Sequence, residues 1–318
     1  MLNQILNILA DGQFHSGEEL GSALGVSRAA VWKHLKKLDE QGIPYSSVKG
    51  KGYRLQDAIE LLDRDRIRAG IRQRLDILEV LLDVNSTNTY LTERAGDHMG
   101  KRYAVLAEKQ VAGRGRRGRL WVSPFGKNIY LSLLVSFNGG LAATEGLSLV
   151  TAIAVERALV RLGISGIGLK WPNDVYADGK KLAGILLEGA GEVAGHCQVV
   201  IGIGLNLSLS EDDARDIQQP WAELRALKPG LSRNEVAAVV LDELLMAVDE
   251  FQKEGFAPLQ QYWSERDIFN GREVRIIAGD HEKRGVVKGV SRKGELMLHS
   301  ERGIETINAG EISVRSAD

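Results

Sequence analysis

The sequence is poor in cysteine and proline and contains no long uncharged hydrophobic run. Cys197 is the only cysteine among 318 residues, so a disulfide within the chain and a zinc site built on paired cysteines are both excluded. No basic residue precedes Arg28, so the charged start of a secretory signal is missing. The longest charge-free apolar stretch with helical patterning, residues 146–155, is about half of the roughly 20 residues that cross a bilayer. We therefore expect a cytoplasmic protein with no membrane partner.

The usual signatures of covalent catalysis and of metal binding are also missing. The chain has no Gly-x-Ser-x-Gly motif, no P-loop and no histidine spacing typical of a metal site. Cys197 lies in a strand-like segment, which favours a small buried hydrophobic residue over a nucleophile. We therefore predict no resident metal, and a chemistry in which basic groups stabilise anionic charge without a covalent enzyme intermediate.

The overall charge is nearly balanced, but the basic residues are clustered. Lysine and arginine together number 41 against 42 acidic residues, which argues against a protein that is positively charged over its whole surface. The first basic cluster lies within residues 28–54 and the second within residues 109–127. The length and the changes in pattern predict an α+β protein of three domains, with boundaries at 1–62, 63–268 and 269–318.

The first 62 residues have the pattern of a winged helix-turn-helix. A short amphipathic helix precedes Ser16 and Glu19, which form a capping box for a second helix that ends at Gly25. Ser27 then caps a third helix, the one that enters the major groove in this motif. Residues 44–55 follow as a β-hairpin wing.

The third helix and the wing carry the residues that we expect to contact DNA. Residues 28–54 contain seven basic side chains against two acidic ones, as contact with phosphates requires. A three-helix interaction module with a merely solvated basic surface is the alternative. The candidate DNA-binding residues are Ser27, Arg28, Trp32, Lys33, Lys36, Lys49 and Lys51.

The second basic cluster contains the sequence GRGRRGR at residues 113–119, which we call the glycine–arginine loop. Its glycines match the dinucleotide-binding pattern G-x-G-x-x-G, but that fingerprint requires a helix directly afterwards. Residues 119–124 include Trp121 and Pro124 and cannot start a helix, so the dinucleotide interpretation fails. Four arginines within six residues instead favour an anionic, phosphate-bearing ligand that orders the loop. An RNA-binding loop or a solvated tip are the alternatives.

Two later segments add candidate residues to the same site. Lys180 and Lys181 enter an apolar strand after a tight turn, and alternation along a strand predicts that one of them points inward. In the strand predicted for residues 199–207, Gly202 and Gly204 permit close approach of a ligand to the backbone. Beyond two further helices, the last fifty or so residues have short strand cores separated by glycine turns, which predict a small β-barrel.

Three motifs together resemble those of the biotin protein ligases. These are GRGRRGR at 113–119, KWPND at 170–174 and KLAGI at 181–185. Because they lie between a helix-turn-helix and a small β domain, the whole chain resembles the bifunctional bacterial members that also repress the biotin operon. The resemblance implies a winged helix-turn-helix, a central mixed-sheet catalytic domain of the biotin and lipoate ligase type, and an SH3-like barrel.

The resemblance implies a two-step reaction and a set of binding residues. ATP with Mg²⁺ activates biotin as biotinyl-5′-AMP, and a lysine of the biotin carboxyl carrier protein of acetyl-CoA carboxylase then receives the biotin. The implied biotin-binding residues are Ser86, Thr87, Asn88, Gln110, Arg114, Gly115, Arg116 and Lys181, of which Lys181, Arg116 and Arg114 are the implied catalytic residues. The implied ATP and adenylate residues are Arg116, Arg119, Trp121, Lys170, Asn173, Asp174, Asn206, Trp221, Glu311 and Arg315.

The resemblance also implies regulation. Biotinyl-5′-AMP would act as corepressor, ordering the glycine–arginine loop and favouring a homodimer that places two recognition helices on operator DNA. Two alternatives of other kinds stay open. One is a lipoate-type ligase, and the other is a transcription factor that senses a small ligand without catalysis.

Overall fold

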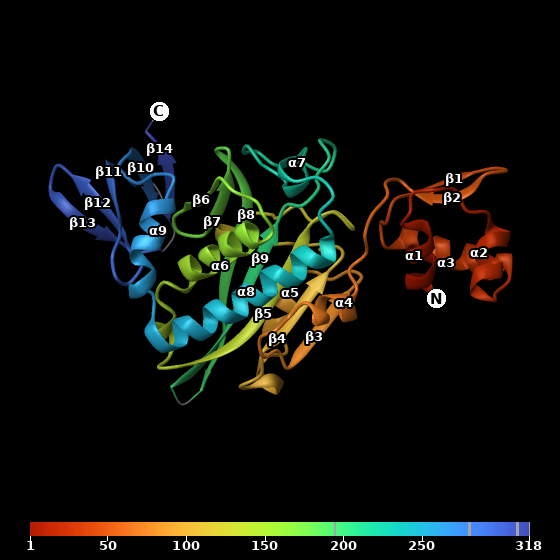
Figure 1. Cartoon of the computed structure of the whole chain (residues 1–318), viewed down its shortest axis with the longest axis horizontal. Coiled ribbons are helices and arrows are strands. Elements are labelled where there is room, and N and C mark those ends of the chain that lie inside the picture. Colours follow the sequence, from red (N-terminus) through yellow and green to blue (C-terminus); the bar gives the residue numbers. More distant parts are fainter. Residues whose placement is uncertain (194, 279–280, 310–311, 318) are drawn as a thin grey trace.

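The computed structural model describes residues 1–193, 195–278, 281–309 and 312–317. Three parts follow one another along the long axis of the molecule, with the N-terminal helices at one end and the C-terminal sheet at the other (Figure 1). A seven-stranded sheet forms the central part. No helix in these ranges has the length and apolarity needed to cross a membrane.

The N-terminal part is the predicted winged helix-turn-helix. Ser16 and Glu19 form the capping box of the second helix, Gly25 ends that helix with a φ of 66°, and Ser27 accepts a hydrogen bond from Ala30 N. These local signals fix the helix boundaries because each acts over three residues of chain. The elements are α1 (Leu2–Leu9), α2 (Gly17–Leu24), α3 (Arg28–Glu40), β1 (Tyr45–Val48) and β2 (Gly52–Leu55).

The central sheet is mixed, with the strand order β3-β4-β5-β9-β8-β7-β6. Only β3 and β4 are parallel neighbours, and the other adjacent strands are antiparallel. The strands are β3 (Ile77–Leu81), β4 (Tyr103–Ala107), β5 (Ile129–Asn138), β6 (Ile167–Lys170), β7 (Asp174–Ala177), β8 (Lys180–Val193) and β9 (His196–Leu205). The apolar run from Ile77 to Leu82 predicts a buried strand, but this prediction is wrong, because β3 lies at the sheet edge and buries only Leu78.

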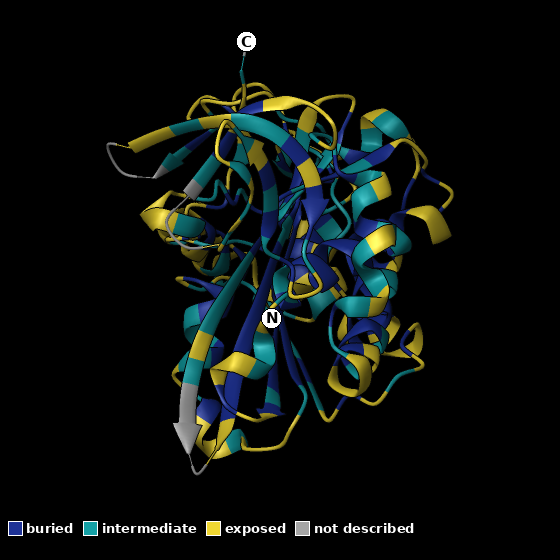
Figure 2. Cartoon of the chain, turned by 90° about the vertical axis from the view of Figure 1, so that its left-hand side faces the viewer, coloured by how far each residue is buried: buried dark blue, intermediate teal, exposed yellow. Residues whose placement is uncertain are grey.

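Helices cover both faces of this sheet. The long helices α6 (Leu147–Arg161) and α8 (Arg233–Glu254) pack on one face, where they share the main hydrophobic core with β4, β5 and β9 (Figure 1). The short helix α5 (Thr87–Thr92) packs on the other face with Tyr103, Val105 and Val200. Figure 2 shows the buried strands beside helices whose residues alternate between buried and exposed, as amphipathic helices require. The remaining helices are α4 (Arg64–Ala69), α7 (Leu224–Leu227) and α9 (Gln260–Arg266).

A buried polar cluster joins the linker after the wing to the central sheet. Arg233 is fully buried and forms an ion pair with Glu108, while its guanidinium donates to the carbonyl of Asn128 at 2.8 Å. Glu60 of the linker accepts from the backbone N–H of Arg233. Glu108 and Asn128 stand at the two ends of residues 109–127, which contain the glycine–arginine loop. The cluster therefore fixes both ends of this longer segment.

The C-terminal part is an antiparallel sheet in the order β13-β12-β11-β10-β14. Its strands are β10 (Glu273–Ala278), β11 (His281–Val290), β12 (Leu296–Ser300), β13 (Gly303–Ile307) and β14 (Ile312–Ser316), and the sequence reasoning missed β14. Among the described residues β13 and β14 do not pair, so barrel closure stays a prediction. The sheet packs on the central part, where Trp171 Nε1 donates to Gly294 O at 3.0 Å.

Candidate active site

A cavity of about 440 Å³ lies where the central sheet, the glycine–arginine loop and β14 meet. Its described lining contains seven basic side chains and one carboxylate, that of Asp174. The cavity therefore suits a ligand that combines an uncharged body with strong negative charge. Most of the predicted site residues line it: Ser86, Thr87, Asn88, Gln110, Arg114, Gly115, Arg116, Arg119, Trp121, Lys170, Asn173, Asp174, Lys181 and Arg315.

One end of the cavity is lined by neutral polar side chains around the start of α5, which are supported by the carboxylate of Glu188. The side-chain oxygen of Gln110 accepts from Thr87 N at 2.9 Å and from Thr87 Oγ1 at 3.1 Å. Asn88 Nδ2 donates to Glu188 Oε2 at 2.8 Å and to Leu186 O at 3.2 Å. Ser132 Oγ lies 2.5 Å from Asn88 Oδ1 and is fully buried. Such a fixed set of donors and acceptors can recognise an uncharged polar ring.

Glycines of the neighbouring strands make room for this wall. A Cβ on Gly202 would lie 2.2 Å from Asn88 Oδ1, and a Cβ on Gly204 would lie 2.3 Å from Trp121 Cε2. Neither distance is compatible with a side chain at these positions, and the close approach of a ligand to this backbone stays a prediction. The approaching groups are Asn88 and Trp121, which themselves line the cavity.

The other end of the cavity carries the lysines. Lys181 Nζ lies 2.7 Å from Asp174 Oδ1, and the two side chains are 15% and 17% exposed. Lys180 is exposed, so the predicted inward lysine is Lys181. Lys170 lies at the end of β6, where burial lowers the pKa of its amine and the nearby Lys181 and Arg315 lower it further against the opposing effect of Asp174. This end can therefore neutralise added negative charge.

The glycine–arginine loop folds across the cavity and contacts both sides. Arg114 donates to Thr89 Oγ1 at 2.9 Å and to Glu188 Oε1 at 3.0 Å. Arg116 donates to Asn173 Oδ1 at 3.1 Å and, from its other terminal nitrogen, to Ala309 O at 2.8 Å. Burial lowers the pKa of the Arg116 guanidinium. The loop therefore joins the polar wall of the cavity to the C-terminal part.

Three predicted adenylate residues are not part of the described lining. Asn206 is buried behind it and donates to Ala222 O at 3.2 Å. Trp221 forms a β-bridge with Lys181, while its neighbour Pro220 lines the cavity. Glu311 lies outside the described residues.

Several lining or supporting groups were missed by the sequence reasoning. Ser132 and Glu188 complete the polar wall, and Tyr176 lines the cavity beside Lys170. The available signal for Ser132 was that it is one of two serines inside the apolar run of β5. Glu188 and Tyr176 had no such signal, because their positions depend on the register of β7 and β8.

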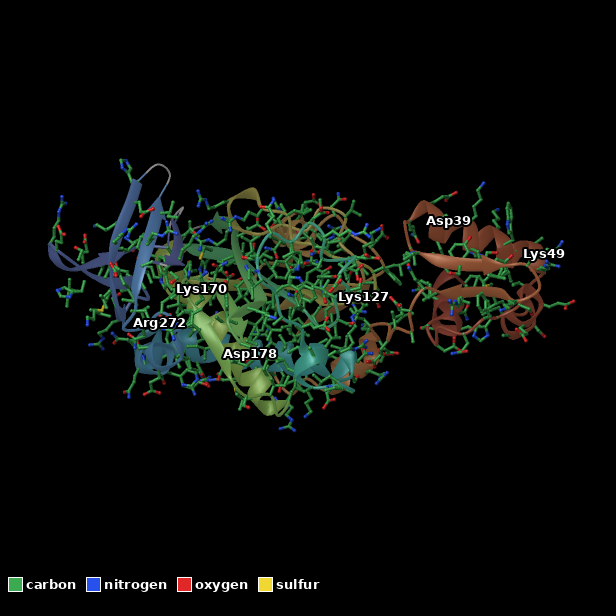
Figure 3. All side chains as sticks on the ribbon, turned by 90° about the horizontal axis from the view of Figure 1, so that it is seen from above. Asp39, Lys49, Lys127, Lys170, Asp178 and Arg272 are labelled. Atoms are coloured by element: carbon green, nitrogen blue, oxygen red, sulfur yellow. The ribbon has the colours of Figure 1, made fainter. Side chains whose placement is uncertain are left out.

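The predicted DNA-binding residues lie away from the cavity. Ser27, Arg28, Trp32, Lys33, Lys36, Lys49 and Lys51 are all exposed. Trp32 is 58% exposed, and Lys36 Nζ lies 5.9 Å from the centre of its ring. Figure 3 shows Lys49 in the N-terminal part and Lys170 near the border between the central and C-terminal parts. The chain thus separates a basic exposed face from a basic cavity.

Comparison with known proteins identifies the family. Residues 81–206 match the model of the biotin/lipoate A/B protein ligase family, residues 1–54 an HTH domain, and residues 269–315 the biotin protein ligase C-terminal domain. The chain is 43% identical over 314 residues to the bifunctional ligase/repressor BirA of Salmonella typhimurium, an alignment that covers 99% of this chain and 97% of that protein. The chain belongs to the biotin protein ligase family.

Two further biotin ligases are similar to about three quarters of this chain. The biotin–[acetyl-CoA-carboxylase] ligase of Paracoccus denitrificans is 35% identical over 73% of this chain and 98% of its own length. The structure of the Aquifex aeolicus biotin protein ligase in complex with biotin and ATP is 29% identical, with a TM-score of 0.65 over 76% of this chain and 100% of its own.

Proposed function

We propose that this chain is a bifunctional biotin protein ligase and repressor, which makes biotinyl-5′-AMP from biotin and ATP and uses it both as intermediate and as corepressor. The observation that carries the proposal is the cavity, which joins a neutral polar wall to a strongly basic end in a chain of this family. The proposed domains are residues 1–62 for DNA binding, 63–268 for catalysis and 269–318 for the small β domain.

The neutral wall is the proposed site of the biotin ring system. The ureido group of biotin has one carbonyl acceptor and two N–H donors, which match the mixed amide and hydroxyl groups of Ser86, Thr87, Asn88 and Gln110. The indole of Trp121, which the resemblance assigns to the adenylate, and the glycine backbone beside it offer an apolar surface where the bicyclic ring and the adenylate would meet. The biotin carboxylate then points toward Lys181 and the glycine–arginine loop, where Arg114, Gly115 and Arg116 close over it.

In the first step, a carboxylate oxygen of biotin attacks the α-phosphorus of ATP and pyrophosphate leaves. The new bond is the mixed anhydride between biotin and AMP, and the bond that breaks joins the α-phosphorus to the bridging oxygen. Lys181 and Arg116 stabilise the negative charge that builds up on the oxygens of the reacting phosphate. Mg²⁺ arrives with ATP, since one lining carboxylate, Asp174, is too few for a resident metal cage.

The remaining basic residues hold the nucleotide. Arg119, Lys170 and Arg315 line the basic end together with Asn173, on the turn before β7, and Asp174, the first residue of β7. Asn206 supports this wall from behind, and Trp221, whose neighbour Pro220 lines the cavity, is proposed to stack its indole on adenine. Glu311 is proposed near the nucleotide from the family motif alone.

In the second step, the ε-amine of a lysine on the biotin carboxyl carrier protein of acetyl-CoA carboxylase attacks the anhydride carbonyl. An amide forms, AMP leaves, and the proton lost from the amine passes to solvent or to AMP. No side chain of the ligase becomes acylated at any point. The described lining of the cavity contains neither cysteine nor histidine.

The regulatory part of the proposal rests on the exposed basic face of the N-terminal part. Biotinyl-5′-AMP neutralises the arginines of the glycine–arginine loop, orders it and favours a homodimer. Two copies of α3 then contact successive half-sites of the operator. The lysines of the wing, Lys49 and Lys51, contact phosphates. The proposed setting is the cytoplasm.

The experiment that tests both activities uses one protein preparation. Biotin transfer to a purified carrier protein is measured with ATP and Mg²⁺, and operator binding is titrated by gel shift with and without biotin and ATP. We expect transfer, and operator affinity that rises when the adenylate forms. Equal operator affinity in both conditions would contradict the corepressor role, and absent transfer would contradict the ligase.

A further inference from the structure

Lys170 is held by two aromatic side chains from different parts of the fold. It ends β6, and Tyr176 lies on the facing strand β7, on the same face of the hairpin by strand alternation. Lys170 Nζ lies 3.2 Å from Tyr176 Oη and 5.1 Å from the centre of the Tyr176 ring. The same nitrogen lies 5.4 Å from the centre of the Phe269 ring. Both rings are within the distance at which an aromatic face attracts a cation.

Phe269 reaches this position because the chain after α9 runs along β6. Ile268 N donates to Leu169 O at 2.9 Å, and Asp267 forms a β-bridge with Leu169. The carboxylate of Asp267 accepts from Phe269 N at 3.0 Å. The residue before Lys170 is therefore bonded to the segment that carries Phe269, so the entry into the C-terminal part fixes the ring beside the amine.

The charges around Lys170 explain why its ammonium needs the contacts with the two aromatic side chains. The charged groups that act on its amine are Asp174 of β7, Lys181 of β8, Arg119 of the glycine–arginine loop and Arg315 of β14. Three of these four are cations, and Asp174 is already paired with Lys181. An unbound lysine has a flexible four-carbon stem and would swing toward solvent under this repulsion. Attraction to the two ring faces and to the tyrosine hydroxyl offsets this repulsion.

We propose that Tyr176 and Phe269 are positioning residues that hold the ammonium of Lys170 at the basic end of the cavity, ready for the phosphates of ATP. This inference rests on the proposed ligase function. Lys170 contacts the nucleotide, whereas the two aromatic residues act through Lys170. Tyr176 then acts on the nucleotide through Lys170 as well as lining the cavity. Phe269, which follows α9, becomes part of the active site.

Two conservative variants test the proposal. Tyr176→Phe removes the hydroxyl and keeps the ring, and Phe269→Leu removes the aromatic face and keeps an apolar side chain. In biotin-dependent exchange between ATP and pyrophosphate, we expect kcat/KM for ATP to fall about tenfold in Tyr176→Phe. The expected fall in Phe269→Leu is about fivefold. The KM for biotin should stay unchanged, because the polar wall is not altered.

A double-mutant cycle separates positioning from a general structural role. In a Lys170→Met background, both substitutions should lose their effect on the residual exchange rate, because the group through which they act is gone. Tyr262→Phe is the matched control. The Tyr262 hydroxyl donates to Glu156 at 2.6 Å and its ring contacts Arg266, so the substitution removes a similar bond at the same junction away from Lys170. Its ATP kinetics should match those of the unaltered chain.

A second measurement does not depend on activity. Acylation of Lys170 by acetic anhydride in the intact chain, followed by mass spectrometry, should become several-fold faster in both variants relative to the exposed Lys180. Unchanged Lys170 acylation in both, or equal kinetic effects with and without Lys170, would overturn the positioning role. Absent exchange in the unaltered chain would overturn the ligase instead, and the acylation rates would then decide the positioning alone.

Discussion

Gly202→Ala is expected to disable biotin binding although it adds only one methyl group. The new Cβ would lie 2.2 Å from Asn88 Oδ1 and 2.8 Å from Asn88 Cγ, whereas real contacts at a Cβ stay above 3.0 Å. Gly202 lies in the centre of β9 and pairs with both Ser132 and Leu186, so the strand cannot move aside. The side chain of Asn88 must therefore leave its place.

The size of the effect follows from the bonds that Asn88 would lose. They are those to Leu186 O at 3.2 Å, to Glu188 Oε2 at 2.8 Å and from Ser132 Oγ at 2.5 Å. At about 1 kcal/mol net for each bond, displacing the Asn88 side chain costs about 2–3 kcal/mol of the free energy that holds it in place. If biotin binding needs Asn88 in place, the Kd for biotin should rise by about 30- to 150-fold.

Calorimetric titration with biotin measures this Kd directly. The matched control is Gly189→Ala in β8, where the nearest atom to an added Cβ is 3.7 Å away and biotin affinity should not change. The clash should also lower the melting temperature of Gly202→Ala. Adding Asn88→Ala removes the clash, so the double variant should regain the melting temperature but not the affinity for biotin. Biotin binding by Gly202→Ala as tight as in the unaltered chain would refute the reasoning.

Three further predictions concern charge. Lys181→Ala should slow adenylate formation by about a hundredfold in single-turnover assays, because it removes a cation that stabilises the reacting phosphate. The operator affinity of the ligand-free chain should stay unchanged. An equal loss of adenylate formation and of operator affinity would contradict the role of Lys181. Arg233→Met leaves the Glu108 carboxylate buried and unpaired, so the free energy of unfolding should fall by about 3–5 kcal/mol in urea titrations and recover in part when Glu108→Gln is added; no loss would show that the pair is dispensable. Burial raises the pKa of Asp267 to about 6 from an unfolded value of 3.8, so the folded state loses stability as the pH rises from about 4 to about 6. Asp267→Asn should therefore gain up to about 3 kcal/mol over the unaltered chain at pH 7.5 relative to pH 4, and a difference that does not vary with pH would contradict the burial argument.

The winged helix-turn-helix could be predicted because its signals are local. Ser16, Glu19, Gly25 and Ser27 each act within a few residues of chain, and all four appear where the sequence placed them. The strand at residues 77–82 was misjudged because an apolar run does not reveal whether a strand lies in the middle of a sheet or at its edge.

The cavity was only partly predictable for a different reason. The motifs at 113–119, 170–174 and 181–185 supplied six of the seven basic side chains of the described lining. Alternation predicted that one of Lys180 and Lys181 points inward, and the structure shows that it is Lys181. Glu188 lies 100 residues from its partner Asn88, and Phe269 lies in another part of the fold from Lys170. Such contacts depend on strand register and on how the C-terminal sheet packs, which no short pattern in the sequence encodes.

Biotin-dependent exchange between ATP and labelled pyrophosphate is the most direct test of the central claim, because it reports reversible formation of the acyl adenylate without a carrier protein or DNA. The unaltered chain should show exchange that requires biotin, and lipoate should not replace it. Exchange with lipoate alone would identify a lipoate ligase instead. No exchange with biotin under conditions in which the chain is folded would contradict the proposed function.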